Sequence, residues 1–149
     1  EAFRNVGYGK TARSPLEAEP LAMFRPNIDR FIMNRDRLLD TAIKVGLEMA
    51  ADYSPTPRGT LQMAGGDAWQ EMTDWLRKTQ AKGYLTPHDV TTGTQIAMIV
   101  TGGDIPEGTE MNESDIFALE RKAFVILAKT AETRARVEHM LPFGSPLRN

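Results

Sequence analysis

The sequence TPHDVTTGTQIAMIVTGG, residues 86–103, decides the fold class of this chain. Thr86 is a helix N-cap, Pro87 suits the first helical position, and Asp89 lies near the positive end of the helix dipole. Apolar residues follow over four turns, and the pair Gly102-Gly103 stops the pattern. The stretch therefore predicts one long, capped helix.

The same signals predict helices on both sides of this stretch. Each predicted helix has a polar N-cap, which is Asp67, Asn112 or Thr130. Gly83 follows the first of these helices, and Pro142, Gly144 and Pro146 end the last. In the middle one, Asp115 lies in the first turn. Trp69 and Trp75 fall on one side of the first of these helices. Both are expected to be packing anchors rather than platforms for a ligand.

Residues before 53 carry fewer helix signals. Ser14 and Pro15 predict a short helix, and Asn34 caps a longer one that runs to about Ala51. Residues 1–13 have no clear period and are expected to be irregular, or the end of a helix. The longer helix carries a stripe that is expected to face a core: Leu38, Leu39, Ala42, Ile43, Leu47 and Ala50.

Proline and glycine concentrate in residues 53–66, which are expected to form the internal linker, with a short strand at Thr60–Met63. Long helices and short loops account for most of the chain. Residues 1–149 are therefore expected to form one all-α segment of four to five helices, with at most a vestigial strand pair.

Composition excludes several functional classes. The chain has no cysteine, which removes thiol catalysis and disulfides and suits a reducing, cytoplasmic location. No apolar run approaches the roughly 20 residues needed to cross a bilayer, so no membrane span is expected. The formal net charge of −2 favours neither nucleic acid nor an anionic membrane as partner.

Charge is nevertheless unevenly distributed. No Lys or Arg lies between Lys82 and Arg121, an interval with seven acidic residues. From Arg121 onward, six basic residues face two acidic ones. This basic tail either attracts phosphate groups or is part of ordinary solvated helix faces, and the sequence leaves both readings open.

No self-contained catalytic or metal site can be assembled. Gly9-Lys10-Thr11 matches the end of a phosphate-binding loop, but Arg4 stands where that loop requires glycine. The chain has two histidines, His88 and His139, without the spacing of metal ligands, and both are expected at the surface or as capping residues.

The acidic residues that follow Gly102-Gly103 also lack the pattern of a metal-binding site. Asp104, Glu107 and Glu110 lie in one loop without the glycine and distal glutamate of a calcium loop. A solvated acidic loop is expected there.

Several short motifs in the correct order resemble one family. They are Phe31–Leu39, the helix start at Tyr84–Asp89, the stop at Gly102-Gly103, Leu119–Phe124 and Pro146–Asn149. Together they look like the carboxy-terminal part of the enoyl-CoA hydratase-like (crotonase-type) segment of long bacterial 3-hydroxyacyl-CoA dehydrogenases. The chain opens at Glu1 without an initiator methionine, which fits a fragment of such an enzyme.

The resemblance implies a function in fatty-acid β-oxidation. The parent's dehydrogenase domains would bind NAD, whereas this segment would hold no cofactor, no metal and no catalytic residue. It would help to shape the acyl-CoA pocket and would contact the upstream domains and other subunits of a homo-oligomer. Taken alone, it is expected to be inactive.

The resemblance also implies two contacts with CoA. Phe143 is the candidate for the adenine and Arg148 for the 3′-phosphate, although Ser145 stands where the family often has lysine. An ordering role for both residues in the tail is the alternative. For the whole chain, the alternatives are a non-enzymatic helical protein-interaction module and a fragment that self-associates through a face that normally docks on a sheet.

Overall fold

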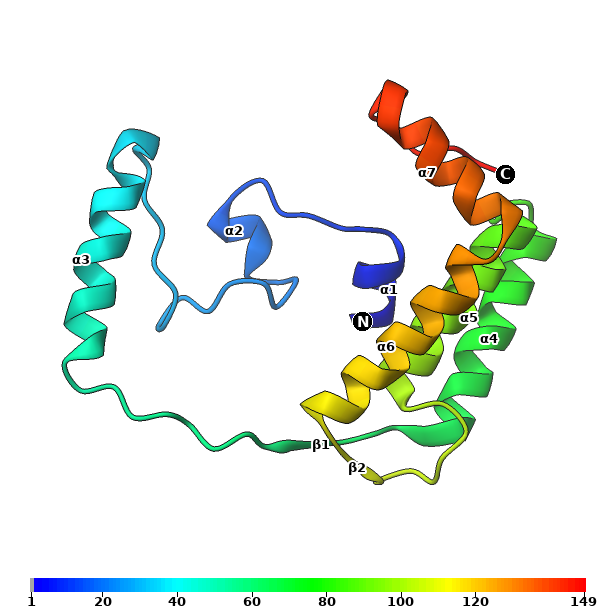
Figure 1. Cartoon of the computed structure of the whole chain (residues 1–149), viewed down its shortest axis with the longest axis horizontal. Coiled ribbons are helices and arrows are strands. Elements are labelled where there is room, and N and C mark those ends of the chain that lie inside the picture. The colour runs from blue at the N-terminus through cyan, green and yellow to red at the C-terminus, as the bar shows by residue number, and fades with distance from the viewer. Residues whose placement is uncertain (1) are drawn as a thin grey trace. The chain divides into compact units, whose positions relative to one another are not determined.

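Residues 2–149 are described by the computed structural model, and Glu1 lies outside them. They contain mostly helix and one pair of short strands, which confirms the expected all-α class with a vestigial strand pair. In chain order the elements are α1 (Ala2–Gly7), α2 (Pro15–Ala18), the 3-10 turn η1 (Arg35–Arg37), α3 (Leu38–Ala50), β1 (Thr60–Gln62), α4 (Gly65–Ala81), α5 (Pro87–Thr101), β2 (Glu110–Asn112), α6 (Glu113–Ala128) and α7 (Ala131–Phe143) (Figure 1).

The chain divides into two units, and each is described by itself. The α4–α7 unit comprises residues 2–8 and 58–149, and the α3 unit comprises residues 9–57. Buried residues occur in the α4–α7 unit, whereas no residue between 9 and 57 is buried. The boundary at residues 57 and 58 falls within the predicted linker.

The core of the α4–α7 unit forms where α4 packs along α5. Leu76 is 4% exposed and Ala97 is fully buried, and Phe3 of α1 completes the cluster. Gly93 permits this close approach, because a Cβ atom there would lie 2.7 Å from Leu76 Cδ2. In Figure 1, α4 and α5 run side by side, and α5 also contacts α6.

The prediction for α5 is confirmed at both ends. The Thr86 hydroxyl accepts a hydrogen bond from the Asp89 backbone N–H at 3.1 Å, and the Asp89 carboxylate accepts one from the Thr86 N–H at 2.8 Å. This reciprocal capping box satisfies two donors that the first helical turn leaves unpaired. Gly102 ends the helix in the left-handed conformation, with φ of +87°.

The start of α4 differs from the prediction. Asp67 is not its cap, because the helix begins at Gly65 and its N-cap, Ala64, makes no side-chain hydrogen bond. Instead, the Gly66 N–H donates to the Ile105 carbonyl at 2.9 Å. A backbone hydrogen bond to the loop after α5 therefore pairs an N–H group of the first turn, which the Asp67 side chain was expected to do. Asp67 itself lies in that first turn.

Residues 2–7 form α1, which agrees with the second of the two alternatives expected for residues 1–13, the end of a helix, and residues 8–13 are irregular. Phe3 is 8% exposed, and its ring meets that of Trp75 nearly perpendicularly, with centroids 6.1 Å apart. A six-residue helix has little stability of its own. Packing against α4 and α5 stabilises it, and such packing leaves no periodicity in so short a sequence.

The predicted strand lies inside the predicted linker. β1 pairs antiparallel with β2, and Leu61 lies opposite Met111. Residues 53–59 are irregular, while β1 and the first turn of α4 occupy most of the remaining positions to residue 66.

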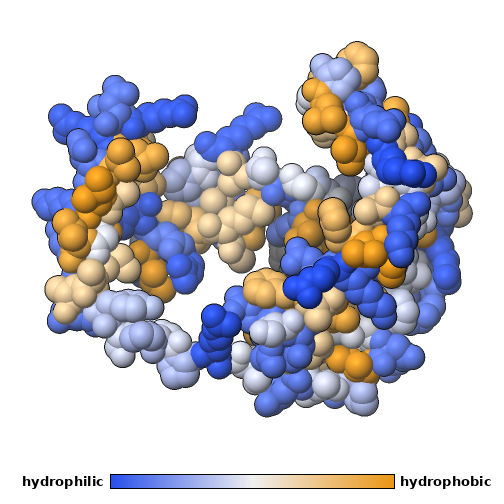
Figure 2. Space-filling model, viewed as in Figure 1, coloured by the Kyte–Doolittle hydropathy of each residue, from blue (hydrophilic) through white to orange (hydrophobic). Residues whose placement is uncertain are grey.

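The α3 unit has its predicted helices but not the predicted core. Asn34 caps η1 by accepting from the Asp36 N–H at 2.9 Å, and α3 follows directly. The stripe expected to be core-facing is exposed instead, with Leu39 at 70%, Ile43 at 54% and Leu47 at 70%. Figure 2 shows this apolar surface along α3, at the left of the view. Periodicity predicts a face that can pack, but it does not say what packs on it.

Candidate functional site

A pocket opens within the α4–α7 unit, between α1, α4, α5 and the tail that follows α7. Its volume is about 320 Å³, at the lower end of the range for small-molecule sites. α1 contributes Phe3 and Arg4, α4 contributes Trp75 and Leu76, and the tail contributes Arg148. The pocket therefore combines an apolar floor with cationic groups.

Arg136 of α7 joins three segments at one side of this pocket. Its Nη2 lies 2.7 Å from Asp89 Oδ1, and its Nε donates to Asn149 Oδ1 at 2.8 Å. The same Nη2 lies 3.4 Å from Thr86 Oγ1. Because Thr86 and Asp89 form the capping box of α5, Arg136 ties the start of α5 to α7 and to the tail.

Asp89 is held in its ionised form by these neighbours. Burial by itself disfavours the charged carboxylate, but hydrogen bonds from the Thr86 backbone and from Arg136 outweigh it and lower the pKa of Asp89 below its ordinary value. The positive charge of Arg136 acts in the same direction. Both side chains are 25% exposed, so solvent screens this pair less than a surface pair.

Two other arginines at the pocket form no ion pair with any of residues 2–149. The Arg4 guanidinium lies over the Trp75 ring, 5.2 Å from its centroid. Arg148 donates to the Tyr84 carbonyl at 3.0 Å and is otherwise exposed. Three arginines and one aspartate line the pocket, which leaves a net formal charge of +2.

The structure places the two predicted CoA contacts apart. Arg148 lines the pocket, whereas Phe143 does not, and the Phe143 ring packs against His139 with centroids 4.6 Å apart. The tail folds back so that the Asn149 side chain reaches the Glu132 carbonyl at 3.1 Å. Glu132 precedes Phe143 by eleven helical positions, or about 16 Å along α7. Arg148 and Phe143 therefore lie near opposite ends of that helix.

His88 is buried rather than at the surface, which is a correction to the sequence reading. It is 5% exposed, and its Nε2 lies 2.9 Å from the Thr133 hydroxyl. This contact joins the first turn of α5 to the first turn of α7. His88 is thus a polar contact between two helices.

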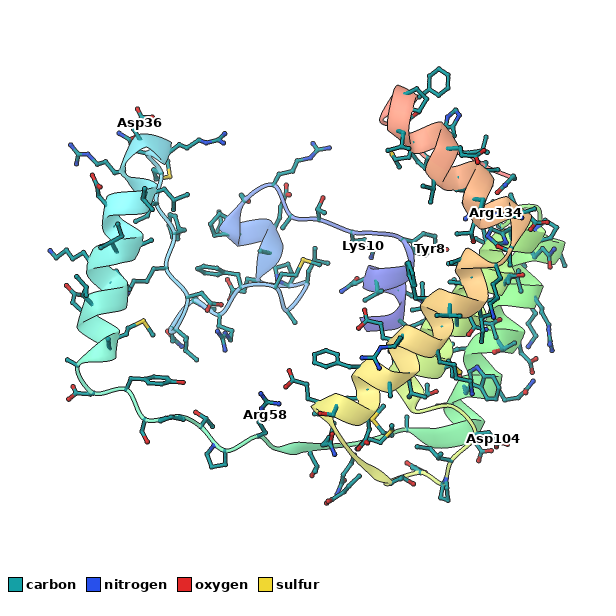
Figure 3. The ribbon with its side chains drawn as sticks, viewed as in Figure 1. Tyr8, Lys10, Asp36, Arg58, Asp104 and Arg134 are labelled. Carbon is teal, nitrogen blue, oxygen red and sulfur yellow. The ribbon has the colours of Figure 1, made fainter. Side chains whose placement is uncertain are left out.

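The acidic loop lies at a second, smaller pocket. Asp67, Asp104 and Glu107 line it with Gly66, and Figure 3 labels Asp104 in the loop after α5. Within residues 2–149, no three acidic or histidine side chains converge closely enough to hold a metal ion. Over the same residues, no helix is both long and apolar enough to cross a membrane.

Sequence reasoning missed Arg4, Tyr84 and Arg136 as members of the site. Arg136 contacts residues 47 and 50 positions away, so no local pattern could have indicated it. For Arg4, the local pattern indicates only that residues 4–11 are not a phosphate-binding loop. Trp75 was expected to be a packing anchor, and it does pack on Phe3, but it also forms part of the pocket wall.

Comparison with known proteins shows a similarity that spans the entire chain. The chain is 27% identical over 150 residues to a probable 3-hydroxyacyl-CoA dehydrogenase of Bacillus subtilis (strain 168), and the match covers 100% of this chain. It covers 19% of the relative, so the chain spans about a fifth of that protein's length. No family model matches the chain. No solved structure matches it either.

Proposed function

We propose that this chain is a helical carboxy-terminal segment of a fatty-acid β-oxidation enzyme of the 3-hydroxyacyl-CoA dehydrogenase and enoyl-CoA hydratase type. The observation that carries the proposal is the similarity of the entire chain to the Bacillus subtilis relative. In this role the segment contributes to an acyl-CoA pocket and to subunit contacts in a homo-oligomer. NAD belongs to the parent's dehydrogenase domains, and the location is cytoplasmic.

The charge of the pocket supports the CoA contact proposed for Arg148. Its guanidinium is exposed and has no carboxylate partner among residues 2–149, so it is available to a phosphate group. Arg4 adds a second positive charge to the same pocket. Phe143 is 68% exposed at the far end of α7, about 16 Å along the helix from the tail. The adenine and the 3′-phosphate of CoA share one ribose, so a CoA held by Arg148 does not reach Phe143 in this arrangement, and the proposal keeps the Arg148 contact alone.

Exposed apolar side chains support the proposed contacts with other domains or subunits. On α6, Phe117 is 52% and Phe124 is 71% exposed, and on α7 Leu141 is 82% exposed. Large apolar side chains gathered on helix faces are typical of surfaces that another part of an assembly covers. The exposed stripe of α3 has the same character.

Calorimetric titration with CoA and with 3′-dephospho-CoA tests the role of Arg148. These ligands differ only in the phosphate, so we expect the chain to bind CoA about tenfold more tightly. Arg148→Gln removes that preference, while Phe143→Ala leaves the affinity for both ligands unchanged, because Phe143 lies outside the pocket. Arg134→Gln is the matched control, because Arg134 is exposed near the start of α7 and does not line the pocket (Figure 3). Equal affinity for both ligands, or no binding, contradicts the proposal.

A non-enzymatic helical interaction module is the second candidate function. The exposed stripe of α3 favours it, because a protein partner could cover Leu39, Ile43 and Leu47. This candidate predicts no heat with CoA and a stoichiometric complex with a protein. Saturable CoA binding that depends on Arg148 counts against it.

A further inference from the structure

The pocket of the α4–α7 unit has a closed apolar floor. Phe3 and Leu76 are nearly buried beneath it, at 8% and 4% exposure. Leu85, Ile96 and Leu147 are half-buried, so each still presents part of its aliphatic side chain. Removing such surface from water is favourable, and a ligand with an apolar body can do this.

The rim of the pocket favours a negative charge. Arg136 is already neutralised by Asp89 at 2.7 Å. Arg4 and Arg148 have no such partner among residues 2–149, and they come from opposite ends of the sequence. The surplus charge of +2 is therefore carried by these two side chains, whose donors can reach a carboxylate or phosphate.

The floor favours an aliphatic body over an aromatic one. The Trp75 ring already has Arg4 over it at 5.2 Å and the Phe3 ring against it at 6.1 Å. The half-buried residues Leu85, Ile96 and Leu147 are aliphatic, whereas Tyr8 and Tyr84, which also line the pocket, are mostly exposed, at 56% and 71%. Aliphatic surface offers burial but no stacking partner.

We propose that this pocket binds a medium-chain aliphatic anion, with its head group between Arg4 and Arg148 and its chain on Leu85 and Ile96. The site lies within one unit of the chain and needs no part of CoA. It therefore goes beyond the proposed function and does not depend on it. Carboxylates and phosphate monoesters both have negatively charged oxygen atoms that accept hydrogen bonds from arginine. Probes that carry the same chain with either head group distinguish between them.

Fluorescence of Trp75 reports on the pocket directly. The chain has two tryptophans, and Trp69 is not in the pocket wall, so Trp69→Phe leaves Trp75 as the reporter. Octanoate and octyl phosphate carry the same chain with different head groups. Octanol lacks the charge, and acetate lacks the chain. We expect saturable binding of both anions and at least about tenfold weaker binding of octanol and acetate.

Charge-removing variants test the head-group contacts. Arg4→Gln and Arg148→Gln keep side-chain donors and should each weaken octanoate about fivefold, with little effect on octanol. Arg134→Gln should change neither ligand. Calorimetry on the unaltered chain must give the same affinities, which shows that Trp69→Phe itself does not change ligand binding. Added salt should weaken the two anions but not octanol.

Several outcomes overturn the proposal. If octanoate binds no more tightly than octanol, the negative charge has no role in binding. If the affinity for octanoate is unchanged in both Arg4→Gln and Arg148→Gln, the head group does not bind between these two residues. CoA results separate the two proposals. Octanoate binding without CoA binding leaves this site standing and contradicts the proposed function, whereas CoA binding without octanoate binding does the reverse.

Discussion

Arg136 is the residue on which the local geometry of the site depends. It contacts the α5 cap through Asp89 and the tail through Asn149, so it fixes the segment that carries Arg148. Sequence patterns predicted the cap, because Thr86 and Asp89 are three positions apart. They could not predict its distant partner.

Replacing Asp89 by asparagine should make stability less dependent on pH. Folding lowers the pKa of Asp89, so its ionised form adds stability above the ordinary pKa of about 4. That contribution disappears as the pH falls through the lower pKa of the folded state. Chemical denaturation should give Asp89→Asn about 1–2 kcal/mol less unfolding free energy than wild type at pH 7. The difference should shrink below about pH 4.

Asp29→Asn is the control for this measurement. Asp29 also has a lowered pKa from hydrogen bonding to Arg25, but the pair is exposed and joins only neighbouring residues. Its removal should leave global stability nearly unchanged. A difference between Asp89→Asn and wild type that is constant from pH 7 to pH 3 would be inconsistent with the pKa argument.

Gly65 should tolerate alanine much less than Gly83 does. Both have positive φ, +76° and +78°, so alanine is strained at either position. At Gly65 a Cβ atom would also lie 2.6 Å from the Ile105 carbonyl oxygen, whereas Gly83 has open space. We expect Gly65→Ala to cost about 3 kcal/mol and Gly83→Ala about 1 kcal/mol of unfolding free energy. Equal losses would show that the contact with the loop is not tight.

At the scale of elements, caps and glycine stops located the helices well. α5 and α6 carry capping boxes, and the caps of α2, η1 and α7 are the residues that the sequence indicated. The start of α4 was predicted wrongly, and the stability of α1 was not predicted, because both depend on contacts between segments. Local signals carry no information about such contacts.

α3 should be much less stable than α5. Thirteen residues are marginal for an isolated helix, and no residue of α3 is buried. Hydrogen exchange followed by mass spectrometry should show peptides from residues 38–50 exchanging at least about 100-fold faster than those from residues 87–101. Gly46→Ala should slow the exchange of α3, because that glycine has open space around it. Comparable protection of α3 and α5 would mean that a surface covers the stripe.

At the scale of the whole molecule, the sequence predicted the fold class and most helix positions but not the pocket. The pocket gathers residues from positions 3 to 148, and the two arginines that form no ion pair within residues 2–149 lie at opposite ends of the chain. Of these two arginines, the sequence predicts only Arg148, through family resemblance rather than spacing. Such a site depends on how helices pack, and helical periodicity describes only which faces are able to pack.

We propose that the whole chain binds CoA and supports the other parts of a larger enzyme but does not itself catalyse a reaction. Spectrophotometric assay of crotonyl-CoA hydration by the purified 149-residue chain tests this claim most directly, with CoA binding by the same preparation as the control for folding. We predict no hydration above the rate in buffer while CoA remains bound. Turnover that scales with the concentration of the chain would contradict the account.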